Sequence, residues 1–339
     1  MLSDGRIVDE PLDRLSCLAC GATSHAVPMD PRRFYTPDYR LPRMAVASDA
    51  ARAKAYAAWI VSLTPRPRRL LEVGCGSGAL IRELAERWPD VACVGVDPAL
   101  PVEFTSERVT LRRGTIADLP DARFDLVIAI NVIEHAFSPH DFLSSLGARL
   151  VPDGRIVVVC PDAAIPNVEL LFLDHVHSLM PRAIATAAEP LSLAGHHPAP
   201  PAIGDFQAFV FGLGDDATQG TFLDFRALAE GRHRYLASWQ ELDERLLSRL
   251  SNRRHVAFGA GQMAALIRAY APGAWARLER LIVDDPSDAW DLGKPVTSPR
   301  SLDDATVLIA TASRSQARVA RRLAQDGVCS IRFDDIVPR

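Results

Sequence analysis

A glycine-rich segment, Leu70–Gly78, is the strongest candidate for ligand binding in the sequence. It reads Leu-Leu-Glu-Val-Gly-Cys-Gly-Ser-Gly, so an apolar run leads directly into three glycines at alternate positions, Gly74, Gly76 and Gly78. Glycine permits a tight turn and lets a ligand approach the backbone. A helix is expected from Ala79, and its first turn would present unpaired N–H groups and partial positive charge. The G-x-G-x-G spacing differs from the G-x-G-x-x-G that is typical of dinucleotide-binding turns.

Polar residues that could contact the same ligand follow the next apolar runs. Asp97 ends the run Ala92–Val96, about 20 residues beyond the loop, where a carboxylate can accept hydrogen bonds from ribose hydroxyls. Asp118 follows a short strand in the segment Gly114–Pro120; a helix cap is the other interpretation of this acid. The strand expected over 124–130 is followed by Asn131.

Histidines occur beside acidic residues in two places, Glu134-His135 and Asp174-His175-Val176-His177. Histidine suits proton removal near neutral pH. Both clusters follow expected strands, and ligands of open α/β sheets bind at the carboxyl ends of the strands. Asp174, His175 and His177 could also form part of a metal site, but no further ligand lies at a suitable spacing, so no metal is expected. The pair His196-His197 precedes a proline-rich stretch and is interpreted as loop surface.

The elements that must position these residues alternate between strand and helix. Short apolar runs separated by mixed helical stretches indicate a parallel sheet with helices on both faces. Residues 151–155 form a turn in this interpretation, and a closing hairpin is expected around Ile203 and 206–211. The expected strands are Leu70–Val73, Ala92–Val96, Leu126–Ile130 and Ile156–Cys160, and the expected helices are Ala50–Val61, Ala79–Trp88 and Phe142–Leu150.

A second, shorter α/β unit follows one or two helices expected within Phe222–Leu250. The segment Val256–Ala264 has the pattern strand-G-x-G-x-x-A, and Asp284 ends the next expected strand. Taken alone, this pattern is a nicotinamide-dinucleotide fingerprint, although the unit is short for a complete dinucleotide domain. Its expected elements are the strands His255–Phe258, Leu281–Val283, Val307–Ala310 and Ser330–Phe333 and the helices Gln262–Tyr270 and Gln316–Gln325.

The order E-V-G-C-G-S-G, V-D, A-D-L-P, F-D-L-V and I-E-H resembles that of class I S-adenosylmethionine (SAM) dependent methyltransferases over roughly residues 50–215. This resemblance implies a seven-stranded sheet with SAM across the strand ends. The glycines would lie against the methionine part, Asp97 would hold the ribose, and Ile116 and Asp118 the adenine. Asn131 would lie near the methionine amine or the acceptor, and Glu72 would orient the amino group. The implied cofactor-binding set is Glu72, Gly74, Cys75, Gly76, Gly78, Asp97, Pro98, Ile116, Ala117, Asp118 and Asn131.

A narrower resemblance points to an acceptor. Residues Phe172–Leu179 are similar to the Y-H-E-H-L-S segment of sugar C-methyltransferases that act on nucleotide-linked deoxysugars, with Asp174-His175 matching the E-H pair. Phe172 replaces the tyrosine, which removes a phenol base, weakens the case for C-methylation and favours His175 as the base. The C-terminal unit is also similar to the domain of that family that helps to hold the substrate nucleotide. The candidate catalytic residues are His175, His135, Asp174, Glu134 and His177.

The N-terminus of the same family usually carries two cysteine pairs that bind zinc. Here Cys17-Leu18-Ala19-Cys20-Gly21 resembles half of such a knuckle. His25 could add a third ligand, but no fourth is evident, and a structural zinc requires four. We therefore expect a degenerate knuckle without metal.

Composition limits the remaining possibilities. The 339 residues have a formal net charge of −4, which argues against broad nucleic-acid binding. No apolar run approaches the roughly 18–20 residues of a membrane span, and an acidic N-terminus without an export signal predicts a cytoplasmic protein. Cys75, Cys93, Cys160 and Cys329 lie in or beside apolar runs and are expected to be buried thiols.

The sequence thus predicts an α/β protein with a class I methyltransferase, Rossmann-like doubly wound sheet and a second, smaller Rossmann-like domain. The expected boundaries are 1–44 (irregular segment), 45–215 (SAM-binding domain), 216–252 (helical linker) and 253–339 (C-terminal domain). The expected function is SAM-dependent O- or C-methylation of a sugar, nucleotide-sugar or glycan with a histidine base. The alternative is a dinucleotide-using or SAM-binding accessory protein without methylating activity. The sequence makes no prediction of the oligomeric state.

Overall fold

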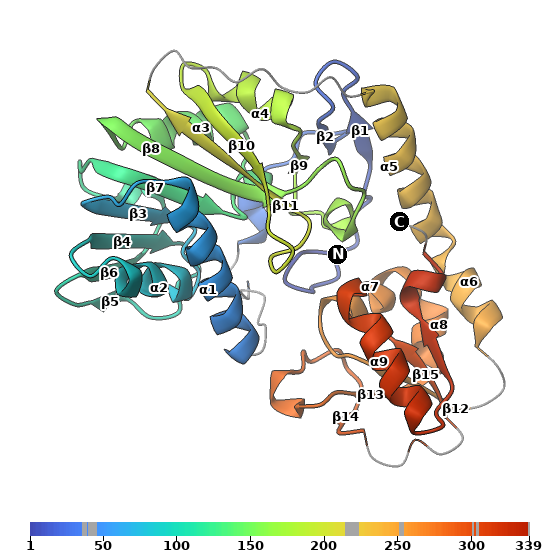
Figure 1. Ribbon diagram of the computed structural model, residues 1–339. Helices are drawn as coiled ribbons and strands as arrows, with labels where there is room; N and C mark the ends of the chain where they lie inside the picture. The colour runs from blue at the N-terminus through green and yellow to red at the C-terminus, as the bar shows by residue number, and fades with distance from the viewer. Residues whose placement is uncertain are drawn as a thin grey trace.

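The computed structural model describes residues 1–35, 39, 46–213, 224–250, 254–299, 302 and 305–337. It contains a large sheet, a small N-terminal sheet and a C-terminal sheet (Figure 1). Two expected domain boundaries lie outside the described residues. They are residue 45, where the SAM domain is expected to begin, and residues 215 and 216, where the helical linker is expected to follow it.

The large sheet has eight strands among the described residues, in the order β10-β11-β8-β7-β3-β4-β6-β5. The strands from β8 to β6 run parallel, whereas β5, β10 and β11 pair antiparallel with their neighbours. Their bounds are Arg69–Val73 (β3), Ala92–Asp97 (β4), Phe104–Thr105 (β5), Val109–Arg113 (β6), Phe124–Ile130 (β7), Leu150–Pro161 (β8), Ser192–Pro198 (β10) and Phe206–Gly212 (β11). The two-residue strand β5 extends the seven strands that the resemblance implies.

Helices cover both faces of this sheet, as the continuous apolar strands require. The helices Val46–Leu63 (α1) and Ala79–Arg87 (α2) pack on one face, through Ile60, Ile81 and Leu84. The helices Pro139–Gly147 (α3) and Pro181–Ala188 (α4) pack on the other, through Leu146 and Ile184. The chain continues from β3 toward β4 and β6 on one side, and β7 and β8 lie on the other side, so the strand order reverses between β3 and β7. In open α/β sheets such a reversal marks the ligand crevice.

Several local expectations were wrong. Helix α3 begins at Pro139, where Ser138 caps its first turn, and ends before Leu150, which starts β8. The expected turn at 151–155 is part of β8, at a register shift where the strand bulges. His196 and His197 lie in edge strand β10 rather than in a loop, and Ile203 lies in the turn between β10 and β11. Cys329 is exposed, whereas Cys75, Cys93 and Cys160 are buried.

The small sheet joins the N-terminus to the middle of the chain. Its strands are Arg14–Ser16 (β1), Thr23–His25 (β2) and His177–Ser178 (β9), paired antiparallel. The Arg14 guanidinium donates hydrogen bonds to the carbonyls of Phe172 and His175, both at 2.7 Å. The segment before β9 is therefore held in place by the N-terminal residues.

The C-terminal sheet is entirely parallel, in the order β14-β13-β12-β15-β16. Helices Phe225–Gln240 (α5) and Leu242–Arg249 (α6) lead into it from the large sheet (Figure 1). Its strands are Arg254–Phe258 (β12), Leu278–Ile282 (β13), Val296–Thr297 (β14), Ala305–Ile309 (β15) and Ser330–Arg332 (β16), and its helices are Gln262–Tyr270 (α7), Pro272–Arg277 (α8) and Ser313–Gln325 (α9). The sequence missed α8 and β14, which are short.

Candidate active site

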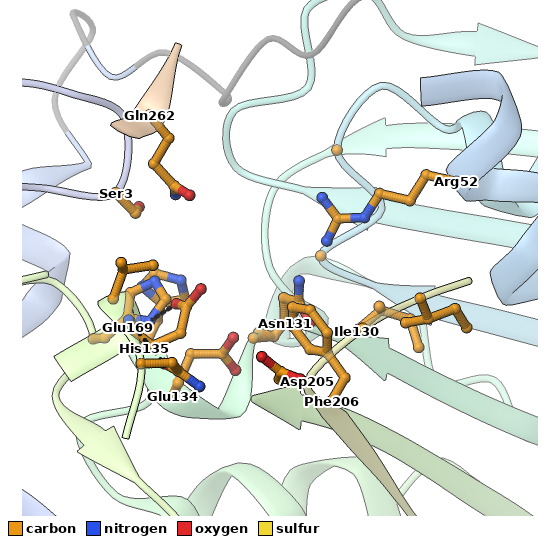
Figure 2. Close-up of a pocket in the computed structure, with 18 of the residues that line it drawn as sticks. Ser3, Arg52, Ile130, Asn131, Glu134, His135, Glu169, Asp205, Phe206 and Gln262 are labelled. Carbon is orange, nitrogen blue, oxygen red and sulfur yellow. Dashed lines mark hydrogen bonds and ion pairs between the residues drawn. The ribbon is translucent and has the colours of Figure 1, made fainter. Parts of the chain in front are cut away.

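One cavity of about 2700 Å³ is lined by the carboxyl ends of parallel strands from both the large sheet and the C-terminal sheet. The loops after β3, β4 and β7 of the large sheet line it, and so do the loops after β12, β13 and β15 of the C-terminal sheet. N-terminal residues also line it, and Figure 2 shows Ser3 and Gln262 on one side of His135 and Glu169. Typical small-molecule sites occupy about 300–1,000 Å³, so this cavity has room for two ligands.

The glycine loop between β3 and α2 has the backbone that its sequence predicts. Gly74 adopts a φ of 76°, and a Cβ there would lie 2.3 Å from a methyl carbon of Val132. Only glycine therefore fits at this position. The amides of Gly74 and Cys75 donate to the Val96 carbonyl at 2.8 and 3.2 Å, which ties the loop to the end of β4.

Asp97 is buried at the end of β4 and joins two loops. One carboxylate oxygen accepts from the Gly76 amide at 2.8 Å and the other from the Ala99 amide at 2.7 Å. Burial raises the pKa of Asp97, and these two hydrogen bonds oppose the rise. Each carboxylate oxygen has a further lone pair, so the side chain can also accept hydrogen bonds from a ligand in the cavity.

The expected cofactor residues divide into two groups. Gly74, Gly76, Asp97, Pro98, Ile116, Ala117 and Asn131 line the cavity, and Glu72, Cys75, Gly78 and Asp118 do not. Glu72 is fully buried, and burial, followed by the nearby Asp97, raises its pKa well above the usual range. The Asp118 carboxylate accepts from the amide and hydroxyl of Thr115, at 2.7 and 2.8 Å, so it caps the turn 116–118. The helix-cap interpretation of Asp118 describes this geometry.

Asn131 directly follows β7, at the point where the strand order reverses. Its φ of 56° is left-handed, a conformation that asparagine tolerates better than most residues. Such backbone outliers gather at functional sites. Figure 2 shows Asn131 between Glu134 and Arg52, beside Asp205 and Phe206 from the β10–β11 side.

His135 has one ring nitrogen fixed by the protein. Its Nδ1 lies 2.9 Å from the backbone carbonyl of Asp174, which can only accept, so Nδ1 carries the proton and Nε2 has the lone pair. The Asp174 carboxylate is 3.8 Å from the same Nδ1. Burial, followed by the neighbouring His175, lowers the pKa of His135 to about 4, so the ring is neutral at pH 7.

His175 is in a different state although its ring centroid is only 4.4 Å from that of His135. Its Nδ1 lies 2.8 Å from a carboxylate oxygen of Glu169. Burial disfavours the charged ring, but the negative charge of Glu169, with smaller contributions from Asp174 and Glu134, raises the pKa of His175 to about 9. A protonated histidine has no lone pair with which to take a proton, so the expectation that His175 is the favoured base conflicts with this geometry.

The neighbouring expected residues have other partners. Asp174 does not line the cavity; its side chain binds Ser3, and its carbonyl orients His135. His177 lies outside the large cavity, in β9, where its Nδ1 is 2.8 Å from the Ser24 hydroxyl. Glu134 is buried, neither of its oxygens has a hydrogen-bond partner among the described residues, and burial raises its pKa to about 7.

The cysteine pair gains no further ligand from the neighbouring histidine. His25 is buried, and its Nε2 lies 2.7 Å from the Leu173 carbonyl. Among the described residues, no group of three or more His, Cys, Asp or Glu side chains could hold a metal ion.

The sequence analysis missed several cavity residues because they come from distant segments. Ser3 and Tyr35 come from the N-terminus, Arg52 from α1 and Glu169 from the 3-10 turn Val168–Leu171. No motif surrounds any of them. Only their proximity to the other cavity residues marks them as candidates, and that proximity exists only in the folded chain.

Comparison with known proteins agrees with the geometry of the part of the cavity that the large sheet lines. Residues 48–194 match the family model described as "Methyltransferase domain". These residues form a methyltransferase domain. The matched residues include the glycine loop, Asp97, Asn131 and both histidine clusters. The cofactor of this domain is SAM.

Curated relatives match the same region. The chain is 33% identical over 126 residues to a ubiquinone biosynthesis O-methyltransferase of Azorhizobium caulinodans, covering 34% of this chain and 49% of the relative. It is 35% identical over 96 residues to an uncharacterised methyltransferase of Mycobacterium tuberculosis, covering 26% and 49%. The chain thus spans about half the length, or less, of the curated relatives that it matches.

Solved structures show a similar but more distant likeness. The mitomycin 7-O-methyltransferase structure is 14% identical, with a TM-score of 0.39, and the match covers 49% of this chain and 54% of that one. A glycopeptide N-methyltransferase complexed with SAM is 14% identical, with a TM-score of 0.38, and the match covers 48% and 94%. Among the described residues, no helix has both the length and the apolar character needed to cross a membrane.

Proposed function

We propose that the protein transfers the methyl group of SAM to a hydroxyl of a sugar, nucleotide-linked or part of a larger glycan, with His135 as general base. The observation that carries this proposal is the single cavity into which the methyltransferase strand ends, His135 and the loops of the C-terminal sheet all open. SAM would occupy the part lined by Gly74, Gly76 and Asp97. The acceptor would occupy the part between His135 and the C-terminal sheet.

His135 fits the role of base because of its tautomer. The Asp174 carbonyl holds the Nδ1 proton, which leaves the Nε2 lone pair available to take the proton of an acceptor hydroxyl as the methyl group arrives. SAM supplies a reactive sulfonium, so the remaining task of the protein is alignment and proton removal. His175, as a cation held by Glu169, would instead favour the negative charge that develops on the acceptor oxygen.

The choice of a hydroxyl rests on two further observations. Several curated relatives are named as O-methyltransferases. Phe172 stands where the sugar C-methyltransferases have a tyrosine, and it is buried with its ring centroid 5.1 Å from that of His175. A C-methyltransferase of that type would need a phenol at position 172, where this chain has a phenylalanine.

The C-terminal sheet supports a sugar nucleotide better than a dinucleotide. Its loop Gly259–Gly261 lines the cavity opposite the methyltransferase strand ends. Asp284, the acid that would bind the ribose of a dinucleotide, forms an ion pair with Arg322 at 3.0 Å. This exposed pairing with Arg322 would compete with a ribose for the Asp284 carboxylate.

A ligand screen tests the proposal. The protein would be heated with SAM, with NAD, and with S-adenosylhomocysteine plus a panel of nucleotide sugars, and sugars that raise the melting temperature would be assayed for methyl transfer by mass spectrometry. A ligand at 100 times its Kd stabilises the fold by about 2.7 kcal/mol. Stabilisation by NAD alone, or methylation of carbon only, would contradict the proposal.

A further inference from the structure

Ser3 lies far outside the matched methyltransferase domain, yet it contacts the group beside His135. Its side chain is almost fully buried and lines the cavity. The Ser3 amide donates to one oxygen of Asp174 at 2.7 Å and its hydroxyl donates to the other at 2.5 Å. Both oxygens of this buried carboxylate are therefore held by one residue that is 171 positions away in sequence.

The hydrogen bonds from Ser3 fix the position of the Asp174 carboxylate relative to His135. Its nearer oxygen remains 3.8 Å from Nδ1 of His135, beyond hydrogen-bond distance. The Nδ1 proton goes instead to the backbone carbonyl of Asp174, at 2.9 Å. A carboxylate that bonded Nδ1 directly would stabilise the imidazolium far more strongly than a carbonyl does.

We propose that Ser3 is a positioning residue, which holds the Asp174 carboxylate beside Nδ1 of His135 without letting it bond that nitrogen. The inference rests on the proposed role of His135 as the base. With Ser3 in place, the nearer Asp174 oxygen stays beyond hydrogen-bond distance of His135 Nδ1, so the carboxylate does not bond the imidazolium and strengthen it directly. The N-terminal segment thus becomes part of the active site of a domain that begins more than 40 residues later.

Other charged groups around His135 act on it in both directions. The His175 cation favours the neutral ring, and the carboxylates favour the charged ring. The titratable groups that face His135 come from its own turn, from the segment before β9, from the turn at 168–171 and from the N-terminus: Glu134, Asp174, His175, Glu169 and Tyr35. Within this set, a change at Ser3 acts directly on Asp174; the Ser3 hydroxyl is also a hydrogen-bond partner of Tyr39, whose ring packs against that of Tyr35.

Ser3→Ala tests the inference because it removes the hydroxyl contact and keeps the backbone amide. Freed from the hydroxyl, the nearer Asp174 oxygen can turn to Nδ1 of His135. We expect the pKa of His135, followed by NMR of carbon-13-labelled histidine, to rise by about one unit or more. The acid limb of the pH–kcat profile should move upward by the same amount. Ser3→Thr, which keeps a hydroxyl, should restore both toward the original values.

The outcomes separate this inference from the proposed function. Identical His135 titration in the original protein and in Ser3→Ala would overturn the inference, as would Ser3→Thr behaving like Ser3→Ala. If His135→Gln keeps full turnover, the proposed base is wrong, whatever the NMR titration shows. If Ser3→Ala is poorly folded, Ser3→Cys provides the measurement, because its thiol has nearly the same shape and is a weak donor; it too must raise the pKa of His135.

Discussion

Two histidines whose rings nearly touch are given opposite properties by their neighbours. Burial and the cationic ring of His175 keep His135 neutral, and the Glu169 carboxylate keeps His175 charged. Environments that separate the pKa values of adjacent groups are how one site obtains both a proton acceptor and a resident charge. The motif around residue 175 pointed to His175 as the base, whereas our proposal assigns that role to His135, because the sequence shows neither the tautomer of His135 nor the carboxylate beside His175.

His135→Gln should reduce methyl transfer by about 10²–10⁴-fold, the range expected for loss of a general base. SAM binding should be unchanged, because His135 lies beyond the glycine loop and Asp97. Turnover would be measured on an acceptor from the ligand screen, and SAM affinity by calorimetry. His233→Gln, on the exposed face of α5, is the matched control. Unchanged turnover in His135→Gln would mean that proximity alone drives the transfer.

Glu169→Gln should make stability depend on pH in a defined direction. Because the pKa of His175 is raised to about 9 from 6.5, the ion pair with Glu169 stabilises the fold fully below pH 6.5. This stabilisation is lost as pH rises through 9. The variant should lose about 3 kcal/mol of unfolding free energy at pH 6 and much less at pH 9.5, measured by urea denaturation. Glu241→Gln, which breaks an exposed pair with Arg245, should change little at either pH; a pH-independent loss in Glu169→Gln would contradict the argument.

Asp97→Asn should weaken SAM binding by about 1.5–3 kcal/mol, the usual loss for a hydrogen bond to a charged group. Asparagine keeps the shape of the side chain but offers one acceptor oxygen instead of two. Isothermal titration with SAM would measure the change, and Asp153→Asn, exposed in the bulge of β8, is the control. Equal SAM affinity in the two variants would show that Asp97 only shapes the loop.

At the scale of elements, the sequence predicted the features that depend on residues close together in the chain, such as turns and buried strands. Gly74 is required by a left-handed turn against Val132, and the apolar strands of the large sheet are buried on both faces. The sequence left two roles open for Asp118, because a cap and a ligand contact use the same side chain at the same position, and the structure shows the cap. His196 was misassigned because an edge strand exposes residues much as a loop does. Ser3 and Glu169 could not have been found, since only the folded chain brings them to His135.

The loop after β12 offers a test of the acceptor half of the cavity. Gly261 lines the cavity with an ordinary backbone conformation, and a Cβ there would meet no atom within 4 Å. Gly261→Val should therefore fold normally and fill space meant for the acceptor. We expect at least a tenfold rise in the acceptor KM with unchanged SAM affinity, since one or two misplaced methyl groups cost about 1–3 kcal/mol in a fitted site. Gly231→Ala, in α5, is the control; an unchanged KM in Gly261→Val would place the acceptor elsewhere.

At the scale of the whole molecule, one buried arginine joins three distant segments. Arg232 on α5 donates to the Gly21 carbonyl, between β1 and β2, and to the Thr23 hydroxyl in β2, both at 2.6 Å, and to the Ala163 carbonyl after β8. It thereby connects the helix that leads to the C-terminal sheet with the N-terminal segment that carries Ser3 and Arg14. Through Ser3, the same segment reaches Asp174 and so His135.

Arg232→Met should therefore impair catalysis more than SAM binding. Methionine fills much of the volume but leaves buried acceptors without a donor, at a cost of about 1–3 kcal/mol each. The N-terminal sheet should loosen, which limited proteolysis before residue 46 would detect. Turnover should fall with it, because Ser3 and Tyr35 of this segment line the cavity. SAM affinity, which depends on Gly74, Gly76 and Asp97, should stay within a factor of about three. Arg234→Met, an exposed neighbour on α5, should change neither. Full turnover in a proteolytically loosened Arg232→Met protein would show that the N-terminal segment is dispensable for catalysis.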